Sequence, residues 1–147
     1  MFHSSPARWL LTLVAVFTLV SPFAADWNAT HIYNPHWPPH AKFHNAQTML
    51  LAVVLGLGTL WLVWRRVSTR SAQVLRLQAA ALLAAAYWLT QALSNTFPGT
   101  GFTDPEFAPV PRIASLPVQL FVDVVALGLV ITAYVLERRR LTEAPLA

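Results

Sequence analysis

Four long apolar runs dominate the chain, separated by shorter segments rich in polar residues and proline. They cover about residues 9–25, 46–64, 77–95 and 116–136. A helix of roughly 20 residues, with about 17 as the lower limit, crosses the hydrocarbon core of a bilayer. Lipid offers no partner to a bare backbone amide, so helix is the only plausible state for each run. The pattern predicts an all-α protein, a single integral membrane domain built as a four-transmembrane-helix bundle, with outer loops at 26–45 and 96–115 and an inner loop at 65–76.

The composition of the 147 residues agrees with this pattern, because 56% are hydrophobic and only 11% are charged, against about 25% in an ordinary globular chain. Eight of the ten Lys and Arg residues lie in three clusters beside apolar runs: Arg8, Arg65, Arg66, Arg70, Arg76, Arg138, Arg139 and Arg140. Under the positive-inside rule these clusters place both termini and the inner loop in the cytoplasm, with Lys42 and Arg112 outside. Despite a net charge of +4, they form no basic stripe for nucleic acid, so the predicted partner is the lipid bilayer.

The first run has a second interpretation as a cleaved signal peptide, because Arg8 precedes an apolar stretch that ends in Phe23-Ala-Ala-Asp26. Cleavage after Ala25 would place Phe23 where a small residue is preferred, so an uncleaved helix that pairs with the second run is favoured. The chain has no cysteine, which leaves the redox compartment open. Without organellar features, the plasma membrane is the default location.

The two outer loops align at an offset of seventy residues, which suggests an internal repeat. Residues 30–39 and 100–109 both read Thr, an apolar residue two positions later, Asn or Asp followed by Pro, an aromatic residue, and Pro two positions beyond. The same offset maps the first run onto the third and the second onto the fourth. Both hairpins would run in–out–in, so the relation would be a parallel repeat, as in parts of some transporters. The alternative is coincidence between two proline-rich loops.

Four of the five histidines lie within fourteen residues of the first outer loop. These candidate metal ligands are His31, His36, His40 and His44. The two prolines before His40 suit the first turn of a helix, which would begin before the membrane and carry His40 and His44 on one face. Such a pair can share a metal such as zinc when a carboxylate or a third histidine completes the shell. The carboxylates on the correct side are Asp26, Asp104 and Glu106. The alternative is packing in the headgroup region, which suits histidine, tryptophan and tyrosine alike.

Asp123 lies seven residues inside the fourth run, roughly 10 Å below its outer boundary at 1.5 Å per residue. An acid at that depth costs a few kcal/mol unless it is paired or neutral, and it marks a functional-site hypothesis. The inner half of the runs carries apolar residues, glycine and scattered Thr and Tyr. The candidate ligand-binding residues therefore all lie in the outer half: Gln47, Thr48, Gln91, Asn95, Gln119 and Asp123. They predict a polar pocket that opens outward, with Asp123 at its floor and His40 and His44 at its rim. A structural hydrogen-bond cluster between helices is the alternative.

The segment 26–48 resembles the signature of an uncharacterised family of small four-helix membrane proteins. The resemblance is carried by Asn34-Pro-His-Trp-Pro-Pro-His-Ala-Lys-Phe-His-Asn-Ala-Gln47, which follows Thr30-His31. It implies that the histidine loop characterises the family, and it supplies no activity. The helix number and one buried acid also give a fold-level likeness to sterol-isomerase-type four-helix membrane proteins, which use acids in a lipid-facing cavity.

Three functions are compatible with these residues. The first is an integral membrane protein whose outer pocket binds a small amphipathic ligand or a partner membrane helix. The second is an enzyme acting on a lipid or sterol-like substrate, with Asp123 and His40 or His44 as catalytic residues that transfer protons. The third is a metal-binding or transport protein that uses the four loop histidines. The sequence assigns no cofactor.

Overall fold

The computed structural model describes residues 5–143, and residues 1–4 and 144–147 lie outside this range. Four long helices make up almost all of it: α1 (Pro6–Asp26), α2 (Pro39–Trp64), α3 (Arg70–Ser94) and α4 (Val118–Glu143). The short elements are the 3₁₀ turn η1 (Pro105–Phe107) and a two-residue hairpin of β1 (Arg112–Ile113) and β2 (Leu116–Pro117). Each of the four helices is long and apolar enough to cross a membrane. The all-α four-helix prediction is confirmed.

Local sequence signals explain where the helices begin. Ser5 caps α1, since its hydroxyl accepts a hydrogen bond from the Arg8 amide, and Thr69 caps α3 in the same way. The cap at Thr69 starts α3 well before the apolar run at 77, so the inner connection shortens to 65–69. The expected proline start of the second helix is confirmed, because Pro39 is its first residue.

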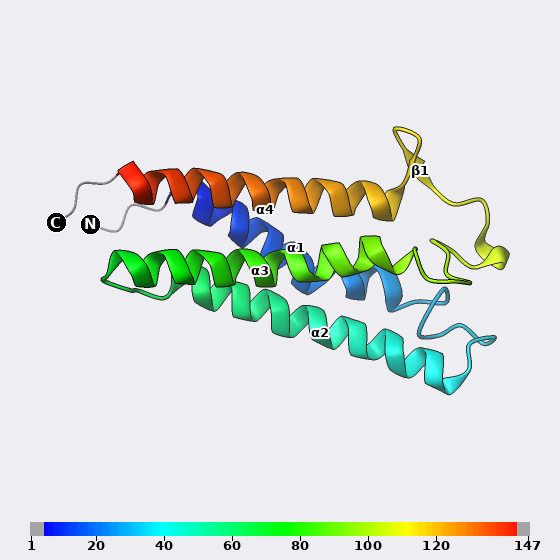
Figure 1. Cartoon of the computed structure of the whole chain (residues 1–147). Coiled ribbons are helices and arrows are strands. Elements are labelled where there is room, and N and C mark those ends of the chain that lie inside the picture. Colours follow the sequence, from blue (N-terminus) through cyan, green and yellow to red (C-terminus); the bar gives the residue numbers. More distant parts are fainter. Residues whose placement is uncertain (1–4, 144–147) are drawn as a thin grey trace.

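The helices form a ring in which sequence neighbours pack side by side (Figure 1). Both α1 and α3 pack against α2 and α4, and they also touch each other across the diagonal. Within residues 5–143, α2 and α4 make no contact. Two hairpins related by a twofold axis along the bundle would have this arrangement. The Trp88 indole N–H also donates a 3.0 Å hydrogen bond to the hydroxyl of Thr18, its counterpart at the offset of seventy. The parallel repeat stays a prediction.

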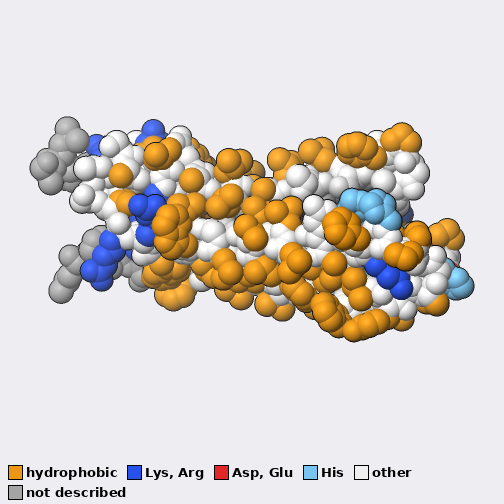
Figure 2. All heavy atoms as spheres, turned by 90° about the horizontal axis from the view of Figure 1, so that it is seen from below, with side chains coloured by type: hydrophobic (Ala, Val, Ile, Leu, Met, Phe, Trp, Pro, Cys, Tyr) orange, Lys and Arg blue, Asp and Glu red, His pale blue; other side chains and the backbone are white. Residues whose placement is uncertain are grey.

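The two ends of the bundle differ, while its middle is apolar. The start of α1, the end of α4 and the 65–69 connection lie at one end, and both proline-rich loops lie at the other (Figure 1). Hydrophobic side chains cover the middle of the face in Figure 2, and most of its Lys and Arg side chains gather toward the end that carries the termini. Large apolar residues such as Leu57, Leu82 and Val124 are more than half exposed, which suits contact with lipid chains.

A buried polar cluster occupies the inner end, just beyond the apolar runs. Glu137 is 3% exposed, and its carboxylate accepts hydrogen bonds from the Ser5 hydroxyl at 2.7 Å and from Arg140 Nη2 at 2.6 Å. Nearby, Arg76 Nη1 donates to the backbone oxygen of Arg65 at 2.8 Å. These polar groups flank the apolar runs, and they are buried because the start of α1 and the end of α4 meet at this end of the bundle.

Candidate functional site

The two outer loops are joined by side-chain hydrogen bonds. The Trp37 indole N–H donates to Asp104 Oδ2 at 2.8 Å, and Asn34 Nδ2 donates to Glu106 Oε1 at 2.7 Å. Asn34 is fully buried, and its own Oδ1 accepts from the His36 amide. Asn34 and Asp104 align at the offset of seventy, and so do His36 and Glu106. The loops therefore contact each other through the two aligned segments.

A cavity of about 450 Å³, here called the outer cleft, lies between these loops and the start of α4. Its polar lining comes from Thr30, His31, Thr103, Asp104 and Gln119, and its aromatic lining from Trp37, Phe102 and Phe107. The remaining lining residues are Gly101, Val110, Pro111 and Val118. A volume of roughly 300–1,000 Å³ is typical of small-molecule sites.

A second cavity of about 210 Å³, the middle cavity, lies beside the outer cleft, between α1, α3 and α4. The two spaces share Val118 and Gln119 in their walls. The other residues of its lining are Phe17, Ser21, Pro22, Ala25, Asp26, Tyr87, Trp88, Gln91 and Val122. The middle cavity therefore mixes polar groups with aromatic and aliphatic side chains.

A third cavity of about 260 Å³, the lateral groove, runs between α1 and α4 and is lined only by apolar residues. They are Leu13, Val14, Phe17, Phe121, Val122, Val125, Ala126 and Leu129. Phe17 and Val122 also line the middle cavity. Leu13 and Val125 are exposed on the side of the bundle, so the groove opens laterally, toward the lipid of a surrounding bilayer.

The three cavities lie next to one another, and their linings become less polar from the outer cleft to the lateral groove. Carboxylates, histidine and amides line the outer part, and aliphatic and aromatic side chains line the inner part. The lateral groove extends along α4 from Phe121 to Leu129, about 12 Å at the helical rise of 1.5 Å per residue. This shape can hold a polar head at the outer surface and a single hydrocarbon chain between α1 and α4.

The charged groups of these cavities are acidic. Asp26 accepts a 2.7 Å hydrogen bond from Asn45 Nδ2, and its other oxygen lies 3.7 Å from His31 Nε2. His31 Nδ1 is 2.7 Å from the Thr30 hydroxyl, and the imidazole meets the Trp37 ring edge-on at 5.0 Å. Neither Lys nor Arg is among the lining residues of the three cavities. The outer part thus combines carboxylates with aromatic walls.

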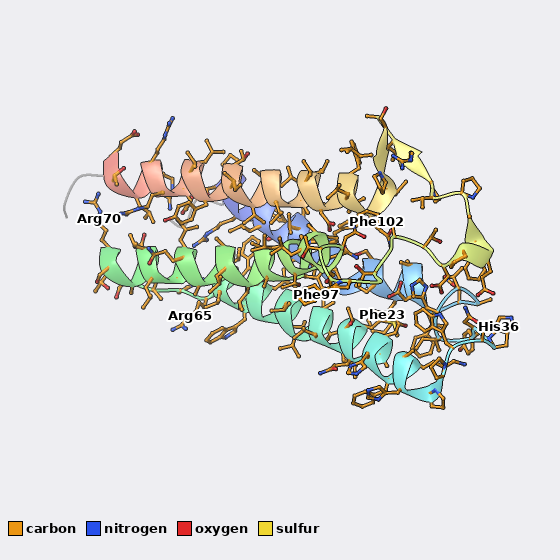
Figure 3. The ribbon with its side chains drawn as sticks, turned by 45° about the vertical axis from the view of Figure 1, so that its right-hand side comes forward. Phe23, His36, Arg65, Arg70, Phe97 and Phe102 are labelled. Carbon is orange, nitrogen blue, oxygen red and sulfur yellow. The ribbon has the colours of Figure 1, made fainter. Side chains whose placement is uncertain are left out.

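The four loop histidines do not converge on one point. His31 pairs with Asp26, His36 with Glu106 at 3.7 Å, and His40 with His44 through Nε2 atoms 3.0 Å apart. Within residues 5–143 no three His, Cys, Asp or Glu side chains form a group that could hold a metal ion. His36 lies at the outer end of the molecule, opposite Arg65 and Arg70 (Figure 3). Each of these three pairs therefore offers at most two ligands to the predicted metal ion.

The polar residues singled out on the helices are divided between the site and the surface. Gln91 and Gln119 line the cavities. Those that lie exposed on α2 or at the end of α3 are His40, His44, Gln47, Thr48 and Asn95. Gln47 Oε1 is 3.2 Å from His44 Nδ1, and the Thr48 hydroxyl donates to the backbone of the preceding turn. These surface residues share no described cavity with Asp123.

Asp123 is fully buried, and neither carboxylate oxygen has a hydrogen-bond partner among the described residues. It does not line the outer cleft, the middle cavity or the lateral groove. A catalytic role for Asp123 with His40 or His44 stays a prediction.

Sequence reasoning did not single out the aromatic walls formed by Phe17, Trp37, Tyr87 and Trp88. Asp26 and Asp104 entered it only as carboxylates that could complete a metal shell. The alignment of the two loops could have identified Asp104 and the aromatic residues beside it as site residues, because they belong to the aligned segment 100–109.

No curated protein and no solved structure matches this chain. One family model does, and it covers residues 10–145, nearly the whole sequence. The four apolar helices and the histidine loop therefore belong to one matched unit, and the chain is a member of DUF6640, a family of unknown function.

Proposed function

We propose that this protein is a multi-pass membrane protein that binds a small single-chain amphipathic ligand. The observation that carries the proposal is that the outer cleft, the middle cavity and the lateral groove are neighbours that share lining residues. The head of the ligand would lie between the outer loops, and its chain would lie between α1 and α4. Because the groove is open on the side of the bundle, such a ligand can enter from the bilayer.

Most of the binding energy must come from the head. A hydrocarbon chain that moves from lipid into an apolar groove gains little, because lipid chains are as apolar as the groove itself. The polar and aromatic groups of the outer cleft are therefore the part that distinguishes this ligand from bulk lipid. The groove supports the chain and sets its direction.

A partner membrane helix is the other occupant that the sequence left open. A helix with its side chains is about 10–12 Å across. The lateral groove, of about 260 Å³, is too small to take up such a cylinder, and a partner helix would insert only side chains into it. The proposal takes a small ligand as the occupant.

Photo-crosslinking with an uncharged alkyl alcohol that carries a diazirine in its chain tests this proposal. The purified protein in maltoside micelles is expected to be labelled on residues of α1 and α4 around Phe17, Val122 and Leu129. Val122→Trp fills the junction between the middle cavity and the groove, so it should reduce labelling at least fivefold. Val124→Trp is the matched control, because Val124 is exposed on α4 and lines none of the three cavities.

Labelling spread over all four helices would contradict the proposal. Equal labelling of the two tryptophan variants would contradict it as well. Comparison of their thermal unfolding in the same detergent separates a filled cavity from a misfolded protein.

A further inference from the structure

The outer cleft and the middle cavity contain two carboxylates and no basic side chain of Lys or Arg in their linings. Asp104 lines the former and Asp26 lines the latter. The outer-face cations Lys42 and Arg112 do not line either space. A phosphate, sulfate or carboxylate head would therefore meet like charge without a compensating cation, which costs free energy in a partly desolvated site.

Each carboxylate is held in place by a neutral donor. Trp37 Nε1 donates to Oδ2 of Asp104. Asn45 Nδ2 donates to Oδ2 of Asp26, whose Oδ1 lies 3.7 Å from His31 Nε2. A neutral donor orients a carboxylate and leaves its charge in place, so the charge of Asp104 remains available to a cation.

Aromatic rings line both the outer cleft and the middle cavity. Trp37, Phe102 and Phe107 line the outer cleft, and Tyr87, Trp88 and Phe17 line the middle cavity. The face of an aromatic ring attracts an ammonium group, and a set of such rings is a recurring way to recognise quaternary ammonium. Each of the two neighbouring spaces thus combines one carboxylate with aromatic rings, a set that is complementary to a cation that carries apolar substituents.

We infer that the ligand is a single-chain amphiphile with an ammonium head, which sits between Asp26, Asp104 and the aromatic walls while the chain follows the lateral groove. This inference rests on the function proposed above and adds the charge of the head.

The test is competition against the uncharged diazirine probe by three dodecyl compounds that differ only in the head. Dodecyltrimethylammonium is expected to halve the labelling at a concentration at least tenfold below that of dodecanol, and dodecyl phosphate is expected to be the weakest. Tetramethylammonium, which lacks the chain, should not compete at the same concentrations. Equal potency of the three dodecyl compounds, or a preference for the phosphate, overturns the inference.

Two variants test which carboxylates produce the preference for ammonium. Asp104→Asn and Asp26→Asn each remove a charge but keep an oxygen that can accept the observed hydrogen bond, and each should reduce the preference for ammonium at least threefold. Glu106→Gln is the matched control, because Glu106 is an outer-loop acid that does not line the cavities. Unchanged preference in both Asn variants overturns the assignment of the head, and the ranking of compounds on the unmodified protein does not depend on how the variants fold.

The outcomes separate this inference from the function on which it rests. If Val122→Trp blocks labelling but the competitors show no preference for charge, the amphiphile site is supported and the ammonium head is refuted. If Val122→Trp does not block labelling, both the site and the ammonium head are refuted. If tetramethylammonium competes as strongly as the dodecyl cation, the ligand is a free cation and the proposal of an amphiphile is refuted.

Discussion

Gly56 of α2 lies against α1, and a methyl group added there would have no room. A Cβ atom at position 56 would lie 2.6 Å from Cγ of Leu19 and 2.9 Å from the backbone oxygen of Ala15. Carbon atoms pack best at about 3.5–4.0 Å, so α1 and α2 would have to move apart by on the order of 1 Å. Neither atom can avoid the contact easily, because one is backbone and the other is a branch carbon close to it.

The expected magnitude follows from two opposing effects. Overpacking of a well-packed contact costs about 1–3 kcal/mol. Replacement of glycine by alanine inside a helix contributes up to roughly 1 kcal/mol in the other direction. Because the clash at Gly56 involves backbone, Gly56→Ala should lower the free energy of unfolding by about 1–2 kcal/mol.

Two other glycines serve as matched controls. A Cβ at Gly128 of α4 meets nothing within 4 Å, so Gly128→Ala should be neutral or stabilising by up to about 1 kcal/mol. At Gly58 the one contact is Leu83 Cδ1 at 3.0 Å, the end of a flexible side chain, so Gly58→Ala should lie between the two. Reversible unfolding in mixed micelles of increasing dodecyl sulfate content, followed by circular dichroism, measures the three variants. Equal stability of Gly56→Ala and Gly128→Ala would refute the close approach of α1 and α2.

Three further predictions concern the ends of the bundle. Ser5→Ala removes both the cap of α1 and a hydrogen bond to the buried carboxylate of the inner cluster, so the same unfolding assay should show a loss of about 1–2 kcal/mol. Trp37→Phe keeps the ring but removes the N–H bonded to Asp104, and limited proteolysis should then cut the outer loops faster than in the unmodified protein. The chain has no cysteine, so single cysteines report its orientation directly. In intact cells, an impermeant maleimide should label Thr100→Cys and not Ser68→Cys if the termini are cytoplasmic, and the reverse result would contradict that orientation.

The sequence predicted the helices well because each depends on properties of its own segment. Length and hydropathy are sufficient to identify the four runs, and the prolines before His40 mark the start of α2. The added turns at the start of α3 came from the cap at Thr69, a local signal that the apolar run does not contain. The hairpin of β1 and β2 delays α4 to Val118 in a comparable way.

The site was harder to predict because it depends on how each helix is rotated about its axis. In a soluble helix one face is polar, which reveals the buried side. In a helix that faces lipid, both the packed side and the outer side are apolar, so the pattern carries little information on rotation. Met49 is buried and its neighbour Leu50 is exposed, although both are apolar.

The sequence alone therefore determined that four apolar helices are joined by a short basic connection and by two proline-rich loops with a shared pattern. Only the tertiary structure decided which polar groups share a space: Gln91 and Gln119 line the cavities, while His40 and His44 lie on the surface of α2. It also brought Trp37 to Asp104 and Ser5 to Glu137, pairs that are distant along the chain. The physical reason is that hydrophobic length is a property of one segment, whereas a cavity is a property of the packing between several.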